Sequence, residues 1–219
     1  METPRRTQNA DCAAGPQIPP LLLATAFTDF ICPFCYIGHV RLLRLRDRYD
    51  LRVNWCLLEI HPDNPPEGRP IEDLGYPKTQ WRQMMDNLER MADEEGLVFA
   101  PRRFTTNSRR ALLLAEAAKD EGRDAFDALA DAVYRAYFTE GRNIGDEAVL
   151  RGVAKGAGLP DGLADRAWSD SAYDERLQGH MAVARRAGVR GTPTFIIGRQ
   201  LIPGAVSTER LLEAAAAAA

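Results

Sequence analysis

The stretch of sequence that decides the fold of this chain is Phe30-Ile31-Cys32-Pro33-Phe34-Cys35-Tyr36-Ile37-Gly38. An apolar run at residues 21–27 precedes it and predicts a β-strand, and the spacing of apolar residues from Tyr36 to Arg48 predicts a helix. Cys32 is therefore expected at a strand-to-helix junction. Unpaired backbone N–H groups and the positive end of the helix dipole stabilise an anion there, so the sequence favours a thiolate at Cys32.

The spacing of the two cysteines predicts thiol chemistry. In Cys-x-x-Cys motifs at helix starts, the thiol pKa falls from about 8.5 to roughly 3.5–7.5. Cys35 lies one helical turn after Cys32 and within its reach. It can therefore attack a mixed disulfide formed at Cys32 and release the partner molecule.

Two other interpretations of this cysteine pair stay open. A structural zinc site normally needs four Cys or His ligands, and the sequence has no second Cys-x-x-Cys and no His-x3-His, so no metal is predicted. Two buried, unreactive cysteines are the simplest alternative. Pro33 at a first helical position after a strand fits a redox motif better.

Composition narrows the class of protein. A chain of 219 residues with 45% hydrophobic residues can bury a sizeable core, and its net charge of −3 implies neither nucleic acid nor an anionic membrane as a partner. Four cysteines do not make a disulfide framework, and the only close pair is 32 and 35. No stretch approaches the ~18–20 apolar residues needed to cross a bilayer.

The N-terminal residues 1–20 have no apolar run of signal-peptide length and predict a disordered leader, so we expect a cytoplasmic protein. The leader contains Cys12. A second strand is predicted at residues 51–58, where Cys56 is most simply a small buried apolar residue. The sequence assigns no role to Cys12 or Cys56.

Helical periodicity dominates the middle of the chain. We divide the chain into an N-terminal part at 21–72, a helical insertion at 73–172 and a C-terminal part at 173–219. Within the predicted helix from Pro77 to Glu95, an apolar stripe is interpreted as core. Its members are Trp81, Met84, Met85, Leu88 and Met91.

The C-terminal part contains a second distinctive segment, Gly191-Thr192-Pro193-Thr194-Phe195-Ile196-Ile197-Gly198. It predicts a short strand that begins with a proline, followed by a partner strand at residues 199–204. The two residues Gly198-Arg199 have the length of a tight hairpin turn, and Ser207 is the expected cap of a final helix.

The order of these elements resembles the thioredoxin fold as elaborated in the DsbA family, and in particular its FrnE-like branch. The resemblance covers residues 21–217. It implies an α/β, thioredoxin-like fold with an inserted all-helical domain. The segments that carry it are Asp29 to Gly38, Asn107-Ser108, Ala136-Tyr137-Phe138, and Gly188 to Phe195.

The resemblance also implies roles for residues. Cys32 matches the nucleophile of that family and Cys35 its resolving thiol. Pro193 matches a cis-proline that faces the disulfide and leaves the backbone of Thr192 free to pair with an extended substrate, a form of strand addition. The expected substrate contacts are Pro33, Phe34, Thr192 and Pro193.

The motif departs from periplasmic DsbA proteins in two respects. They carry a histidine between the cysteines, whereas this chain has Phe34, so we expect a less depressed thiol pKa and a less oxidising couple. They also carry a buried glutamate on the first strand, where this chain has Ala26. The candidate tuning residues here are Asp29, Glu59 and His39.

The favoured function is a thiol-disulfide oxidoreductase of the dithiol-disulfide isomerase type, acting on protein or small-molecule disulfides as a monomer or homodimer. It needs no cofactor besides its own cysteines, with glutathione as a candidate co-substrate. One alternative is a glutathione-dependent isomerase or transferase of the kappa or hydroxychromene-carboxylate isomerase type, although those usually have serine where Cys32 stands. Another is a zinc-binding or redox-sensing module without catalytic activity.

Overall fold

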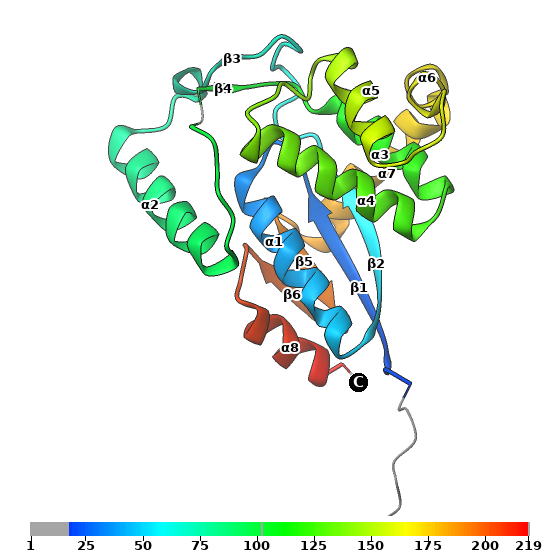
Figure 1. Cartoon of the computed structure of the whole chain (residues 1–219). Helices are drawn as coiled ribbons and strands as arrows, with labels where there is room; N and C mark the ends of the chain where they lie inside the picture. The colour runs from blue at the N-terminus through cyan, green and yellow to red at the C-terminus, as the bar shows by residue number, and fades with distance from the viewer. Residues whose placement is uncertain (1–17, 102, 219) are drawn as a thin grey trace, which may run out of the picture.

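The first predicted strand forms the centre of a mixed four-stranded sheet in this computed structural model, which describes residues 18–101 and 103–218. It is β1 (Leu21–Thr28), and the strand order is β2-β1-β5-β6 (Figure 1). Most of the expected leader, including Cys12, lies outside the described residues.

The neighbours of β1 bring distant parts of the chain together. Strand β2 (Asp50–Leu57) pairs with β1 in parallel, and β5 (Thr194–Ile197) pairs with its other edge in antiparallel orientation. Strand β6 (Gln200–Pro203) completes the sheet, and Ile197 lies opposite Gln200. The predicted two-residue hairpin turn is therefore confirmed, and the proline-led strand lies beside the strand that leads to the cysteines.

Alternate side chains of β1 point to opposite faces of the sheet, as strand geometry requires. Ala24 and Ala26 join the apolar cluster that includes Leu42 of α1 (Pro33–Leu43). Phe27 joins the cluster that contains Ala184 of α7 (Ser171–Ala187). The sheet is thus covered by helices on both faces, with α1 on one side and α7 on the other (Figure 1).

The helix that carries the cysteines begins where the sequence predicted but ends earlier than expected. Pro33 is its first residue, as expected, and Cys32 is its N-cap in extended conformation, so the helix starts three residues before the periodic run that begins at Tyr36. Its regular part ends at Leu43, and the expected continuation is a 3-10 turn at Arg44–Asp47 closed by a bond from the Arg48 N–H to the Leu45 carbonyl.

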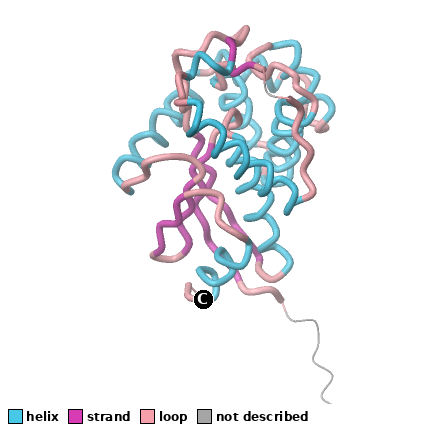
Figure 2. Tube along the Cα trace, turned by 90° about the vertical axis from the view of Figure 1, so that its left-hand side faces the viewer, coloured by secondary structure: helices cyan, strands magenta, loops and turns pink. Residues whose placement is uncertain are grey.

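The middle of the chain is mostly helical and gathers at the C-terminal end of β1 and β2 (Figures 1 and 2). One feature was not predicted by helical periodicity: β3 (Arg69–Pro70) and β4 (Phe104–Thr105) pair as a small antiparallel ladder. The division of the chain into three parts stays a prediction. The remaining α-helices in the described residues are α2 (Lys78–Glu95), α3 (Arg109–Asp120), α4 (Arg123–Tyr134), α5 (Glu147–Gly156), α6 (Leu163–Ser169) and α8 (Thr208–Ala216).

The apolar stripe of α2 divides into two environments. Its C-terminal members Leu88 and Met91 are buried against α1, as expected of core. Its N-terminal members Trp81 and Met84 are only half-buried and line a cleft. Interpreting the whole stripe as core was therefore wrong for its first turns, because periodicity identifies an apolar face without showing what lies opposite.

Candidate active site

The two cysteines of the motif lie at the start of α1 with different access to solvent. Cys32 is 7% exposed and lines a cleft of about 580 Å³, whereas Cys35 is 1% exposed and does not line it. The Cys35 backbone N–H donates to the Cys32 carbonyl at 3.0 Å, which fixes the first turn. A visiting molecule can therefore meet the Cys32 sulfur, and Cys35 lies behind it.

The two thiols also differ in acidity, and the more accessible one is the more acidic. The pKa of Cys32 is lowered, chiefly because the Cys35 thiol donates a hydrogen bond to the Cys32 sulfur, and this outweighs the opposing effect of burial. The pKa of Cys35 is raised well above its ordinary value, first by burial and then by the neighbouring Cys32. The pair thus combines a favoured thiolate at the cleft with a protonated thiol beneath it.

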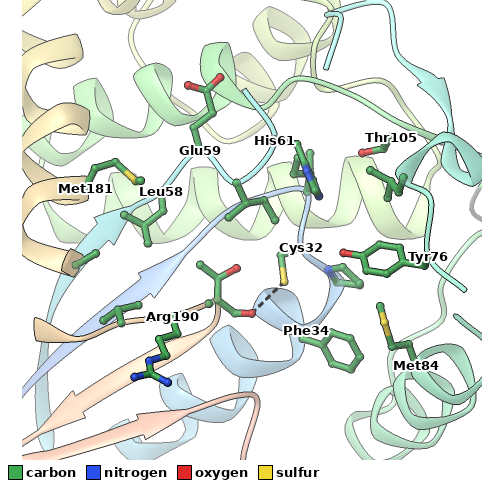
Figure 3. A pocket seen from close by; sticks show the side chains of 18 of the residues that line it. Cys32, Phe34, Leu58, Glu59, His61, Tyr76, Met84, Thr105, Met181 and Arg190 are labelled. Carbon is green, nitrogen blue, oxygen red and sulfur yellow. Dashed lines mark hydrogen bonds between the residues drawn. The ribbon is translucent and has the colours of Figure 1, made fainter. Parts of the chain in front are cut away.

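The loop that contains the predicted proline contacts Cys32 through Thr192. The Thr192-Pro193 peptide bond is cis, and the Cys32 thiol donates to the Thr192 carbonyl across 3.5 Å (Figure 3). The Pro193 carbonyl accepts from the Gly204 N–H at 2.8 Å, which ties the loop to the segment after β6. Thr192 also lines the cleft.

Gly38 of α1 permits this close approach. A Cβ at this position would lie 2.9 Å from the ring of Phe195 and 3.1 Å from Cγ of Pro193. Any larger residue would push the proline loop away from the helix that carries the cysteines. The glycine that ends the motif therefore sets the distance between the two halves of the site.

Asp29 is a fully buried carboxylate just before the motif. It accepts hydrogen bonds from the Ile60 N–H at 2.9 Å, the Ser108 hydroxyl at 3.1 Å and the Ile31 N–H at 3.3 Å. Burial nevertheless raises its pKa from 3.8 to about 7. The negative charge of Asp29 in turn acts to raise the pKa of Cys32.

The other two candidate tuning residues have different surroundings. Glu59 lines the cleft, but its carboxylate is held by Arg109 at 2.8 Å and by the Asn107 amide at 2.9 Å. His39 is buried rather than exposed, and its Nε2 lies 2.8 Å from the Asp131 carboxylate on α4. His39 thus links α1 to the helical part of the chain.

Two hydroxyl groups near Cys35 were not identified from the sequence. The Thr28 hydroxyl, at the end of β1, lies 2.7 Å from the Tyr134 hydroxyl of α4 and also hydrogen-bonds the Cys35 sulfur, which lowers the pKa of that thiol. Burial raises the pKa of Tyr134 well above its ordinary value. Nothing in the local pattern around Tyr134 distinguishes it from an ordinary core aromatic.

The walls of the cleft come from five separate segments of the chain. Phe34 and Pro33 flank Cys32 on α1, and Tyr76 and Met84 lie on one side of the cysteine with Arg190 on the other (Figure 3). Phe34 is half-buried, so its ring is available to a molecule in the cleft. Of the four predicted substrate contacts, Pro33, Phe34 and Thr192 line the cleft and Pro193 does not. Their role in binding a substrate stays a prediction.

Cys56 lies apart from this site. It is 1% exposed on β2, and burial raises the pKa of its thiol. Cysteines 32, 35 and 56 are all in the free form. In the ranges 18–101 and 103–218, no group of three or more His, Cys, Asp or Glu side chains is arranged to hold a metal ion. No helix in these same ranges is long and apolar enough to span a membrane.

Comparison with known proteins agrees with the geometry. The uncharacterized protein YwbO of Bacillus subtilis is 26% identical over 189 residues, which is 84% of this chain and 90% of YwbO. The crystal structure of a probable DsbA oxidoreductase from Streptomyces coelicolor is 26% identical, with a TM-score of 0.79 over 90% of this chain and 89% of the other.

The cytosolic disulfide reductase DsbM from Pseudomonas aeruginosa, solved with glutathione, has the same fold. It is 21% identical, with a TM-score of 0.64 over 90% of this chain and 95% of DsbM. A family model described as a DSBA-like thioredoxin domain matches residues 25–216. The chain therefore belongs to the DSBA-like thioredoxin domain family.

Proposed function

We propose that this protein is a thiol-disulfide oxidoreductase in which Cys32 is the nucleophile and Cys35 the resolving thiol. The Cys32 thiolate attacks one sulfur of a substrate disulfide, and the first half of the substrate leaves as a thiol. Cys35 then loses its proton and attacks the Cys32 sulfur, which releases the second half. The substrate disulfide gains two electrons, and the pair becomes a Cys32–Cys35 disulfide.

One observation carries this proposal: the accessible cysteine is the one whose pKa is lowered, and the inaccessible cysteine is the one whose pKa is raised. Nucleophilic attack needs an exposed thiolate. Resolution needs a second thiol that does not react with solvent oxidants before the mixed disulfide forms. Two inert cysteines would not need to differ in this way.

The surroundings support more specific roles. Thr192 and the cis Pro193 support pairing with an extended substrate, because the Thr192 backbone faces the Cys32 sulfur. Asp29, whose pKa is about 7, changes charge near neutral pH and is the proposed tuning group for the thiolate. His39 and Glu59 are already paired elsewhere and are not given this role.

Finer assignments belong to the same proposal. We place the protein in the FrnE-like branch and in the cytoplasm, with the direction of electron flow set by its potential against the thiols of that compartment. The glutathione-bound, cytosolic DsbM supports glutathione as co-substrate. Isomerase activity requires a couple poised between oxidant and reductant. Phe34, which has no charge, supports a couple less oxidising than that of periplasmic DsbA proteins.

The test is reduction of insulin disulfides by the purified protein with glutathione as electron donor. Cys32→Ser should abolish the Cys32-dependent rate, and Cys35→Ser should accumulate a mixed disulfide on Cys32 that mass spectrometry detects. Full activity of Cys32→Ser would remove this cysteine from the mechanism. Conjugation of glutathione to an electrophile without any disulfide, retained in Cys35→Ser, would favour the isomerase or transferase class instead. Zinc bound stoichiometrically through both cysteines would favour a non-catalytic module.

A further inference from the structure

The two sides of the cleft around Cys32 differ in chemistry. Figure 3 shows the Cys32 sulfur between Tyr76 and Met84 on one side and Arg190 on the other. A disulfide bound across this sulfur has one half on each side. The two halves therefore meet different surroundings.

The first side is apolar and is built by the segment from Leu74 to Met84. Tyr76 and Trp81 stack with ring centroids 6.0 Å apart, and both line the cleft with Met84. Tyr76 is 40% exposed, so a large apolar surface stands open beside the reactive sulfur. Covering such a surface is favourable by roughly 25 cal/mol per Å² of apolar area.

The second side is cationic. Arg185, near the end of α7, and Arg190, in the loop that follows it, both line the cleft and are exposed. No carboxylate in the described part of the chain forms an ion pair with either guanidinium. By contrast, Glu59, the cleft carboxylate, is paired with Arg109, which also contacts Asp174. The charge available to a bound molecule on this side is positive.

We infer that the preferred substrate is an asymmetric disulfide with one anionic half, bound on the side of Arg185 and Arg190, and one bulky apolar half, bound on the side of Tyr76, Trp81 and Met84. A conjugate between a carboxylate-bearing thiol and an aromatic or aliphatic thiol has this chemistry. The inference rests on the proposed function, because the reaction is the same. The substrate disulfide is reduced by two electrons to two thiols, and the Cys32 and Cys35 thiols are oxidised to one disulfide.

Four soluble mixed disulfides, each made from one charged and one uncharged thiol, separate the effect of the charged half from that of the apolar half. Glutathione or cysteamine supplies an anionic or a cationic half, and benzyl mercaptan or 2-mercaptoethanol supplies an apolar or a polar half. Each is mixed with fully reduced protein for a single turnover, so no other reductant is needed. The second-order rate of Cys32–Cys35 disulfide formation is divided by the rate of the same probe with dithiothreitol, which corrects for intrinsic reactivity.

Glutathione with benzyl mercaptan should react fastest. Exchange of the benzyl half for the polar half should slow the reaction about tenfold, as loss of a small apolar group in a pocket does. Exchange of glutathione for cysteamine should slow it up to about fivefold, as expected for exposed ion pairs, and the difference should shrink in 1 M salt.

Matched variants assign each effect to a side of the cleft. Arg190→Gln should reduce the preference for the anionic half, because only Arg185 then keeps its charge beside the cleft. Arg186 is exposed on α7 and does not line the cleft, so Arg186→Gln should leave this preference unchanged. Met84→Ala should reduce the preference for the benzyl half. Met85 does not line the cleft, so Met85→Ala should leave this preference unchanged.

The outcomes separate this inference from the proposed function. Equal corrected rates for all four probes, still abolished by Cys32→Ser, would overturn the asymmetric substrate and leave the oxidoreductase standing. Preferences that keep their full size in both Arg190→Gln and Met84→Ala would also overturn it. Absence of any Cys32-dependent reaction would instead overturn the proposed function.

Discussion

The Cys32 thiol lies 3.5 Å from the carbonyl oxygen of Thr192, a residue 160 positions later in the sequence. The contact forms because β5 pairs antiparallel with β1, whose C-terminal end leads into the cysteine motif. Two segments at opposite ends of the chain thus complete one site. The helical part between them supplies the wall of the cleft that carries Trp81 and Met84.

The first prediction concerns the source of the acidity of Cys32. Because the hydrogen bond from the Cys35 thiol is the largest cause of the lowered Cys32 pKa, Cys35→Ala should raise that pKa. Cys35→Ser keeps a hydroxyl donor and should raise it less. The measurement is the pH dependence of Cys32 alkylation by iodoacetamide, read by mass spectrometry of the Cys32 peptide. An unchanged midpoint in Cys35→Ala would show that the Cys35 thiol is not the main cause of the lowered Cys32 pKa.

The second prediction concerns Asp29 and stability. The pKa of Asp29 is raised from 3.8 to about 7 in the folded protein, so folding favours its protonated form. This contribution is fully present below pH 3.8 and is lost as the pH rises to about 7, by an amount on the order of 4 kcal/mol at most. Asp29→Asn cannot titrate, so its advantage over the native protein should grow between pH 4 and pH 7. Urea unfolding of both proteins, fully reduced, across this range measures the difference.

Two neighbours of Asp29 give controls of opposite sign. The Ser108 hydroxyl donates to the carboxylate and lowers its pKa. Ser108→Ala should therefore raise the pH at which the Asp29 contribution to stability is fully lost. The charge of Glu59 raises the pKa of Asp29, so Glu59→Gln should lower the pH at which this contribution is lost. If this pH range is the same in both variants as in the native protein, Asp29 is not the titrating group.

The sequence predicted the parts of this site that depend on local geometry. A Cys-x-x-Cys at a strand-to-helix junction with a proline at the first helical position specifies where the cysteines lie, and β1, α1 and the β5–β6 hairpin follow from periodicity and turn residues. Each of these features is encoded by a few neighbouring residues. The conformation of Thr192-Pro193 was expected from resemblance alone, because an X-Pro bond has only a ~5% prior of being cis.

The environment of each polar group could not be predicted in the same way. Asp29 and His39 are both buried because α3 and α4, more than sixty residues later, pack over them and supply Ser108 and Asp131 as partners. No local pattern identifies such partners. The same holds for Trp81 and Met84, whose helix has a clear apolar face but whose first turns lie over a cleft rather than a core.

The third prediction tests whether His39 only links α1 to α4 or also tunes the redox properties of the cysteines. Its partner Asp131 is exposed, and although burial acts to raise the Asp131 pKa, the hydrogen bond and charge of His39 lower it overall. The pair therefore stabilises the fold at neutral pH, and this is lost as the pH falls below 3.8. Asp131→Asn should cost less than about 1 kcal/mol at pH 7 because the carboxylate is exposed. It should leave the redox equilibrium of the protein with glutathione unchanged, and a shift in that equilibrium would restore His39 as a tuning residue.

The last prediction uses two helical glycines with opposite surroundings. Gly38 on α1 faces Phe195 and Pro193, so the methyl group of Gly38→Ala must displace the proline loop, with an expected cost of about 1–3 kcal/mol. Gly179 on α7 is exposed and has open space around its missing Cβ, so Gly179→Ala should stabilise the protein by about 0.5–1 kcal/mol through helix propensity. Urea unfolding compares the two. Only Gly38→Ala should also slow disulfide exchange at Cys32, because only that change moves Thr192 relative to the sulfur; equal rates in both variants would mean that the position of the proline loop does not govern the reaction.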